Sequence, residues 1–285
     1  MDARLEAWKK RGDFVEIGGR RIFWWERGSG PVVLALHGFP ASSYDWRLVA
    51  DLLPNHRFVA FDLPGFGLSD KSPTADYSLE GHATVAEGIL KHLEVESCDV
   101  VAHDIGDSVA AELMHRSNNG SLSFGLNRVA LLNGSIFIDM AQLTSGQKLF
   151  LKLPARPMKF APPVRMFRRQ IKSLYSPAHR PPTEEFEMME LFLKHEDGLR
   201  IIPITIRYIN ERRRNQRRWT DSLAQFPGEL AALWGQLDSV AVPAMVDRLA
   251  ELRPSTRIVR WTDVAHWPQV EVSDRVAAEL HEFFT

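Results

Sequence analysis

The chain is poor in cysteine and in long apolar runs. Its 285 residues contain one cysteine, Cys98, so no disulfide can form within the chain. Cys98 opens the run CDVVAH, where a buried thiol on a strand is a better interpretation than a reactive one. No apolar run approaches the ~20 residues of a membrane span, and the N-terminal sequence MDARLEAWKKRGDF lacks the apolar core of a signal peptide. We expect a cytoplasmic protein without a membrane span, either a monomer or a homodimer.

An excess of charge of one sign is also missing. The chain has 35 Lys and Arg against 36 Asp and Glu, whereas a general nucleic-acid binder needs a broad basic surface. We therefore expect no nucleic-acid partner. One basic run, Arg212–Arg218, could bind an anionic partner, but a solvated helix face is the favoured interpretation. The ten histidines include no pair with the spacing and supporting ligands of a metal site, so no metal is predicted.

Short apolar runs alternate with longer helical patterns along most of the chain. Most runs are continuously apolar, as expected for strands that are covered on both faces. Gly18-Gly19 predicts a hairpin turn between the first two, and right-handed crossovers should join the others into a mostly parallel sheet flanked by helices. The predicted strands are 14–17, 21–26, 32–36, 57–61, 99–103, 128–132, 230–234 and 257–261, and helices are predicted at 79–93, 107–116 and 243–252.

This alternation stops between residues 135 and 222. The segment contains the Pro-rich breaks LPARP, APPV and RPP and helical stretches such as EEFEMMELFLKH. It predicts a helical cap, residues 135–222, inserted after the sixth strand. The core would then consist of residues 1–134 and 223–285, within the size range of a single α/β domain.

Chemically active side chains follow three of the predicted strands. Asp104 follows the strand 99–103, Asp238 comes shortly after the strand 230–234, and His266 comes shortly after the strand 257–261. Because ligands of open α/β sheets bind beyond the carboxyl ends of parallel strands, these residues should meet at one edge. The chain order of nucleophile, acid and histidine is that of the α/β hydrolases. His266 would activate water as a general base, and Asp238 would orient its ring.

Asp104 stands where a serine hydrolase holds its serine. The pattern Ala102-x-Asp104-x-Gly106 lies between a strand and a helix, and its small flanking residues suit a strained turn. Asp104 could instead be a helix N-cap. Because Asp107 would fill that role at least as well, we favour Asp104 as a nucleophile.

Two residues compete with Asp238 for the role of orienting acid. Asn133 follows the sixth strand but carries no charge, and Asp263 is too close in sequence to His266 to be favoured. Asp238 therefore remains the prediction.

The loop HGFP, after the strand 32–36, should help to stabilise charge at the reaction centre. The backbone N–H groups of Phe39 and Ile105 would form an oxyanion hole, in which one donor contributes about 3–4 kcal/mol in a serine protease. His37 is better interpreted as a hydrogen bonder that braces this loop. The residues predicted to surround the substrate are His37, Phe39, Trp46, His103, Ile105, Asn133 and Trp267.

Seven stretches of the chain resemble a known family: HGFPASSYDW, FDLPGFGLSDK, AHDIGD, LLNGSIF, RYINERRRNQRRW, LWGQLDSVAVP and AHWPQVE. They are similar to α/β hydrolases of the epoxide hydrolase and haloalkane dehalogenase group, and in particular to the mesoderm-specific transcript protein and its bacterial relatives. The resemblance implies an α/β-hydrolase fold with a helical cap, and an Asp nucleophile that forms a covalent alkyl-enzyme ester. Water activated by His266 would open the ester at Asp104, with no cofactor. The chain lacks the apolar N-terminal segment of the animal protein, which supports a soluble form.

The side chains around Asp104 indicate which of the substrates that a carboxylate can attack are favoured. Attack on the sp³ carbon of an epoxide, alkyl halide or haloacid leaves an ester, whereas attack on a carboxylic ester would leave an anhydride. Haloalkane dehalogenases typically place Trp and often Asn where this chain has Ile105 and Phe39. Fluoroacetate dehalogenases carry Arg residues where this chain has Ile105 and Asp107, and an acid would repel an anionic substrate.

Epoxide opening also needs an acid, which the resemblance assigns to lid tyrosines. The inserted region contains Tyr208, at the expected position, and Tyr175, a weaker second candidate; the alternative for each is packing within the lid. We expect an epoxide hydrolase whose partners are a small or medium apolar epoxide and water. The alternatives are a dehalogenase-like enzyme with atypical halide donors and a non-catalytic binding protein with a vestigial site.

Overall fold

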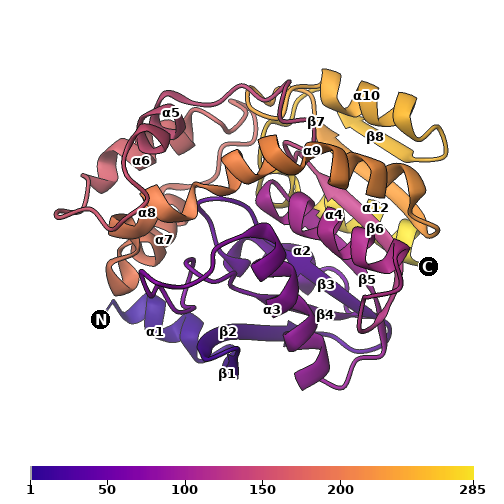
Figure 1. Ribbon diagram of the computed structural model, residues 1–285, viewed down its shortest axis with the longest axis horizontal. Coiled ribbons are helices and arrows are strands. Elements are labelled where there is room, and N and C mark those ends of the chain that lie inside the picture. Colours follow the sequence, from indigo (N-terminus) through magenta and orange to yellow (C-terminus); the bar gives the residue numbers. More distant parts are fainter. Residues whose placement is uncertain (1) are drawn as a thin grey trace.

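A single sheet with helices on both faces organises the computed structural model, which describes residues 2–285 (Figure 1). Eight strands lie in the order β1-β2-β4-β3-β5-β6-β7-β8. The pairs β1–β2 and β2–β4 are antiparallel and all later pairs are parallel, so the predicted mostly parallel α/β-hydrolase sheet is confirmed. The strands are β1 (Asp13–Ile17), β2 (Arg20–Arg27), β3 (Val32–Leu36), β4 (Arg57–Phe61), β5 (Ser97–His103), β6 (Gly125–Leu132), β7 (Glu229–Gly235) and β8 (Arg257–Trp261).

The continuous apolar runs form strands because side chains are buried on both faces of the sheet. Along β3, Leu34 and Leu36 belong to a core cluster shared with α3 and α4, whereas Val33 and Ala35 belong to a second cluster shared with α2 and α12. This two-residue alternation follows from the pleat of a strand. The helices of the core are α1 (Ala3–Lys9), α2 (Arg47–Asp51), α3 (Leu79–His92), α4 (Ile105–Asn118), α10 (Ala244–Leu252), α11 (Pro268–Glu271) and α12 (Ser273–Phe284).

Five helices lie between β6 and β7, in the segment expected to form the cap. Prolines precede α6 and α7, and a capping box between Thr144 and Gln147 begins α5, consistent with the helix-start preferences of these residues. These helices are α5 (Ser145–Lys152), α6 (Val164–Lys172), α7 (Thr183–Lys194), α8 (Gly198–Thr205) and α9 (Tyr208–Gln225). Helix α9 passes the expected cap boundary at residue 222 and runs from the cap across α4 (Figure 1).

Two further sequence features lie within the fold. Cys98 is on β5 and only 1% exposed, and burial raises the pKa of its thiol, as expected for a structural cysteine. Across residues 2–285, we find no helix with both the length and the apolar character required to cross a membrane.

Candidate active site

Asp104 occupies a strained turn between β5 and α4. Its backbone has φ 50° and ψ −105°, a combination that costs free energy and clusters at functional sites. Gly106 allows α4 to approach β3, because a Cβ atom there would lie 2.4 Å from the carbonyl oxygen of Leu36. Although Asp104 is the N-cap residue of α4, its side chain makes no capping hydrogen bond. The carboxylate is therefore free for other contacts.

One of those contacts comes from the loop after β3. The N–H of Phe39 donates to Oδ2 of Asp104 at 2.9 Å, and the N–H of Ile105, at the first position of α4, has no partner within the helix. His37 holds this loop in place: its Nδ1 donates to the carbonyl of Gly38, and its Nε2 accepts from Leu63 N–H. The bracing contacts predicted for His37 are thus present.

His266 and Asp238 form a hydrogen-bonded pair beside this turn. Nδ1 of His266 donates to Oδ2 of Asp238 at 2.7 Å. In the neutral ring Nε2 is then unprotonated and can accept a proton as a general base. Asp238 also accepts from the N–H groups of Val240 and Ala241 and from Nδ2 of Asn133. Asn133 therefore orients the carboxylate and does not replace it.

The pKa of His266 reflects two opposing effects. Burial by itself lowers the pKa, because the charged imidazolium is desolvated. The carboxylates of Asp238 and Asp104 outweigh that penalty, so the pKa lies above the ordinary histidine value. Asp263, the other candidate acid, accepts instead from His179 and Arg275 at the surface.

Asp104 and His266 line the same cavity, a concave site of the kind in which small molecules bind. Its wall is mainly apolar. The lining residues are Phe39, Pro40, Asp104, Thr144, Gly146, Gln147, Phe150, Phe167, Gln170, Ile171, Leu174, Ile206, Val240, His266 and Trp267. Most of the apolar wall and three neutral polar side chains (Thr144, Gln147 and Gln170) come from the segment between β6 and β7.

The structure brings only part of the predicted substrate pocket to this cavity. Phe39 and Trp267 line it, whereas five residues do not: His37, Trp46, His103, Ile105 and Asn133. Trp46 is wholly buried in the cluster on the α2 and α12 side of the sheet. His103 lies behind His266 and donates from Nε2 to its carbonyl at 2.7 Å. All seven residues were chosen because of their positions in the sequence near strand ends and loops. Such positions do not show whether a side chain lines the cavity or packs behind the residues that line it.

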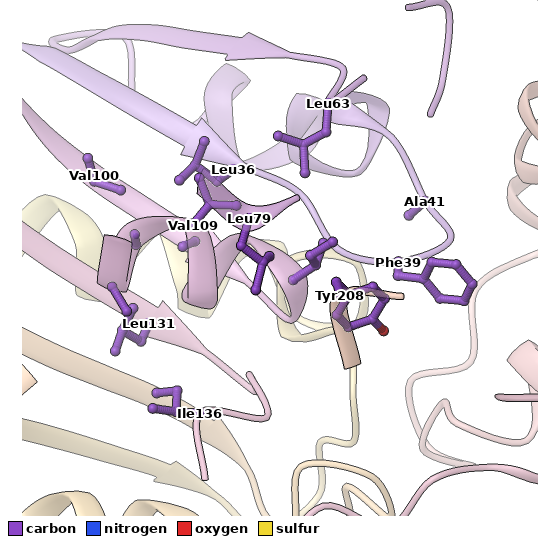
Figure 2. Packing of buried hydrophobic residues seen from close by; sticks show 14 of the residues in the cluster. Leu36, Phe39, Ala41, Leu63, Leu79, Val100, Val109, Leu131, Ile136 and Tyr208 are labelled. Atoms are coloured by element: carbon purple, nitrogen blue, oxygen red, sulfur yellow. The ribbon is translucent and has the colours of Figure 1, made fainter. Parts of the chain in front are cut away.

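The two lid tyrosines have different surroundings. Tyr208 packs against Phe39, with ring centroids 5.7 Å apart (Figure 2), and its buried hydroxyl has no hydrogen bond of normal geometry, although the carboxamide of Gln147 lies beside it. Burial and the Asp104 carboxylate both raise the pKa of Tyr208. Tyr175 stacks on Trp267 at 5.0 Å, and neither tyrosine belongs to the cavity lining.

Asp107 does not face a substrate, contrary to the sequence-based argument that it would repel anions. It is fully buried and packs against Gly134, where a Cβ atom would lie 2.0 Å from its carboxylate. Burial raises the pKa of Asp107 well above its ordinary value, which favours the uncharged form. Asp107 therefore gives no reason to exclude anionic substrates. The N-cap position of α4, for which Asp107 was considered as suitable as Asp104, is occupied by Asp104.

The basic run 212–218 is not simply a solvated helix face. Arg212 is only 3% exposed and donates to Ser108 and to the carbonyl of Asp104, while Arg218 binds the buried carboxylate of Glu112. Neither of these buried contacts was predicted from the sequence. A usable signal was the four-residue spacing between Arg212 and Tyr208, which puts them on one face of a helix.

The described part of the chain contains no group of side chains suited to bind a metal ion. Among residues 2–285, the His, Cys, Asp and Glu side chains form no cluster of three or more that could hold an ion. The polar groups that the structure does bring together at the cavity are the Asp104 carboxylate, the His266–Asp238 pair and the backbone N–H of Phe39.

Comparison with known proteins identifies the family. Residues 32–279 match the model of the alpha/beta hydrolase family, and the chain belongs to that family. It is 38% identical over 269 residues to a putative hydrolase, LipZ, from Mycobacterium tuberculosis, covering 94% of this chain and 93% of that protein. It is 32% identical over 288 residues to the mesoderm-specific transcript homolog protein of Homo sapiens, covering 95% and 85%. The resemblance stated from the sequence is confirmed.

Solved structures support the same fold. An alpha/beta hydrolase fold protein from Burkholderia ambifaria has a TM-score of 0.77 at 21% identity, over 95% of this chain and 97% of that one. A thermophilic esterase from Thermogutta terrifontis has a TM-score of 0.76 at 19% identity, over 96% and 97%. At these identities the likeness concerns the fold alone.

Proposed function

We propose that this hydrolase opens small or medium apolar epoxides through an ester on Asp104. The observation that carries the proposal is the Asp104 carboxylate itself, which lines the same cavity as His266 and has Oδ2 bound to Phe39 N–H. A carboxylate at this position suits attack on an sp³ carbon, because the product is a hydrolysable ester. The mainly apolar wall favours an apolar substrate.

The first step would form the ester. An oxygen of Asp104 attacks one epoxide carbon, and the carbon–oxygen bond of the ring breaks with its electrons on the departing oxygen. That alkoxide takes the proton of Tyr208, whose buried hydroxyl otherwise lacks a normal hydrogen bond. Buried hydrogen-bond donors are rarely left without an acceptor, and the substrate oxygen would be the acceptor for this hydroxyl.

The second step would release a diol. Nε2 of His266 takes a proton as water attacks Cγ of Asp104, and the resulting oxyanion is stabilised by the N–H groups of Phe39 and Ile105. The ester bond then breaks, the diol oxygen takes the proton from His266, and the proton left on Asp104 returns to the Tyr208 phenolate through solvent. The net reaction adds one water to the epoxide.

A second candidate is a dehalogenase. The carboxamides of Gln147 and Gln170 line the cavity and are N–H donors that a departing halide could use. Both reactions share the ester on Asp104, so one trapping experiment can distinguish them.

The test is the intact mass of a His266→Gln variant after exposure to styrene oxide or to bromobutane. This variant lacks the base for ester hydrolysis, so we expect a stable adduct with the mass of a whole epoxide, located on Asp104 by peptide mapping. An Asp104→Asn/His266→Gln variant is the matched control and should gain no mass. An adduct from bromobutane alone would make the protein a dehalogenase, and a folded variant without any adduct would contradict the proposal.

The lid acid is tested with a pair of tyrosine variants. In the His266→Gln background, Tyr208→Phe should slow labelling by styrene oxide about 10²-fold or more, the usual scale of a lost general acid. Tyr175→Phe is the matched control and should label at close to the parent rate, since Tyr175 packs against Trp267 and Phe186, whereas Tyr208 lies near the Asp104 carboxylate. Equal rates for both variants would remove Tyr208 from the mechanism.

A further inference from the structure

Arg212 is a buried cation that makes direct contact with the nucleophile turn. Its Nη2 donates to the carbonyl oxygen of Asp104 at 2.7 Å and lies 3.5 Å from Oδ1 of the same residue. Its Nε donates to Oγ of Ser108 on α4 at 2.7 Å. The guanidinium also lies over the ring of Tyr208, 4.7 Å from the centroid. Arg212 thus touches both the nucleophile and the proposed lid acid.

Burial makes the charge of Arg212 significant. A guanidinium that is 3% exposed must be balanced by a carboxylate and by hydrogen bonds, because an unpaired buried charge is strongly unfavourable. The neighbouring acid Asp107 is shifted toward its uncharged form. Asp104, whose Oδ1 lies 3.5 Å from Nη2 of Arg212, is the anion that pairs with this guanidinium.

The two oxygens of Asp104 have different partners. Oδ2 accepts from Phe39 N–H, whereas Oδ1 faces Arg212. A cation beside Oδ1 and a hydrogen-bond donor on Oδ2 oppose rotation of the carboxylate, and a neighbouring cation generally favours the ionised form of a carboxyl group. An ionised carboxylate is the form that attacks an sp³ carbon, and it is also the form restored when the ester is hydrolysed.

Arg212 comes from a different part of the fold from Asp104. It belongs to α9, which continues from the cap and docks on α4 through Arg218 and Trp219, both bound to the carboxylate of Glu112. Seating of α9 on α4 therefore sets the position of the guanidinium.

We infer that Arg212 is a positioning residue that holds Asp104 ionised and oriented, so that the nucleophile is complete only when α9 is docked on α4. The contribution of Arg212 to catalysis rests on the proposed function of Asp104 as the nucleophile. The ion pair itself does not depend on which substrate is used.

Other titratable groups also surround Asp104 and must be kept constant in a test. Arg212 and Tyr208 face it from α9, Asp107 from α4, His266 from the loop after β8, and His37 from the loop after β3. Only Arg212 is a permanent cation. Replacing it should change the ionisation of Asp104 more than replacing any of the other four groups.

The experiment is an NMR titration of protein labelled at the aspartate carboxyl carbons, with the Asp104 signal assigned by its loss in Asp104→Asn. In Arg212→Met, the midpoint for Asp104 should move to higher pH by about one unit or more, the usual effect of a neighbouring arginine. Arg212→Lys, which keeps the charge but not the geometry of the fork, should move it less. Arg217→Met is the matched control, since it removes an exposed arginine from the same helix without disturbing its contact with α4, and should leave the midpoint unchanged.

Labelling by styrene oxide in the His266→Gln background separates this inference from the proposed function. An unmoved Asp104 midpoint in folded Arg212→Met, or an equal movement in Arg217→Met, overturns the role of Arg212. If the midpoint moves as expected while neither styrene oxide nor bromobutane labels Asp104, the positioning role stands and the proposed chemistry is overturned.

Discussion

Asp238 illustrates how single residues set up this site. Its carboxylate accepts four hydrogen bonds, two from backbone N–H groups, one from Asn133 and one from His266. Such a carboxylate cannot rotate, so the His266 ring is held with Nδ1 protonated and Nε2 free, the arrangement that carboxylate–histidine pairs generally impose. The pKa of His266 then depends on whether the charge at residue 238 is present.

We expect Asp238→Asn to change both the rate and the pH dependence of hydrolysis. The variant should lose roughly 10³–10⁴-fold in rate, as in comparable triads. A general base must be neutral, so activity is lost as pH falls through the pKa of His266. Because burial lowers that pKa and Asp238 raises it, the acid limb should move to lower pH in the variant. Steady-state rates against pH measure both effects.

Asp263→Asn is the control for that prediction. Asp263 is only three residues from His266 in sequence but pairs with His179 and Arg275. Its variant should keep both the parent rate and the parent acid limb. A parent-like profile for Asp238→Asn would contradict the assigned pair.

At the scale of elements, the contact between α9 and α4 depends on a buried acid. Glu112 on α4 is 1% exposed and accepts from Arg116, Arg218 and Trp219 at 2.9–3.1 Å. Burial raises its pKa, but these hydrogen bonds outweigh that effect and the pKa lies below the ordinary glutamate value. Glu112 is therefore ionised and joins the two helices near neutral pH.

Glu112→Ala should destabilise the protein by about 2–3 kcal/mol, because it leaves charged donors and the Trp219 N–H without a partner. Part of the loss is moderated by solvent, since Arg218 is partly exposed. Urea unfolding measures the change in the free energy of unfolding. The control is Glu251→Ala on α10, an exposed residue, which should change it by less than about 0.5 kcal/mol. Equal effects would contradict the docking role of Glu112.

At the scale of the whole molecule, four buried histidines link folding to pH. Burial is the largest cause that lowers the pKa of His37, His56, His82 and His103. For His82 the pKa falls to about 3, and neither ring nitrogen has a hydrogen-bond partner. In the unfolded chain the same ring would titrate near 6.5. The unfolded state therefore binds more protons between these two values.

His82→Leu should remove part of the acid sensitivity of the fold. Stability rises with pH wherever the unfolded state binds more protons, so His82 costs stability as pH falls below about 6.5. Between pH 7.5 and 5, the difference in unfolding free energy between variant and parent should move by about 2 kcal/mol in favour of the variant. Urea unfolding at the two pH values measures it, and the packing change cancels in the comparison. A constant difference would mean that His82 titrates alike in the folded and unfolded states and that burial does not lower its pKa.

Much of this molecule follows from local sequence. The apolar runs predicted all eight strands because strands covered on both faces need apolar residues at every position. The placement of Asp104, Asp238 and His266 at one edge followed from the same pattern, since the carboxyl ends of parallel strands meet there. The contacts of His37 could also be anticipated, because it follows directly after a buried strand.

The surroundings of buried charged residues depend instead on which faces of neighbouring helices pack together. Arg212 and Arg218 lie in a polar run that periodicity alone assigns to solvent, and only the docking of α9 on α4 buries them against Asp104 and Glu112. Asp107 faces Gly134 and not the cavity for the same reason. The sequence by itself determined the sheet and the three strand-end residues, because backbone geometry and burial pattern are local. Tertiary packing decided which charges surround the nucleophile, because that depends on residues more than 100 positions apart.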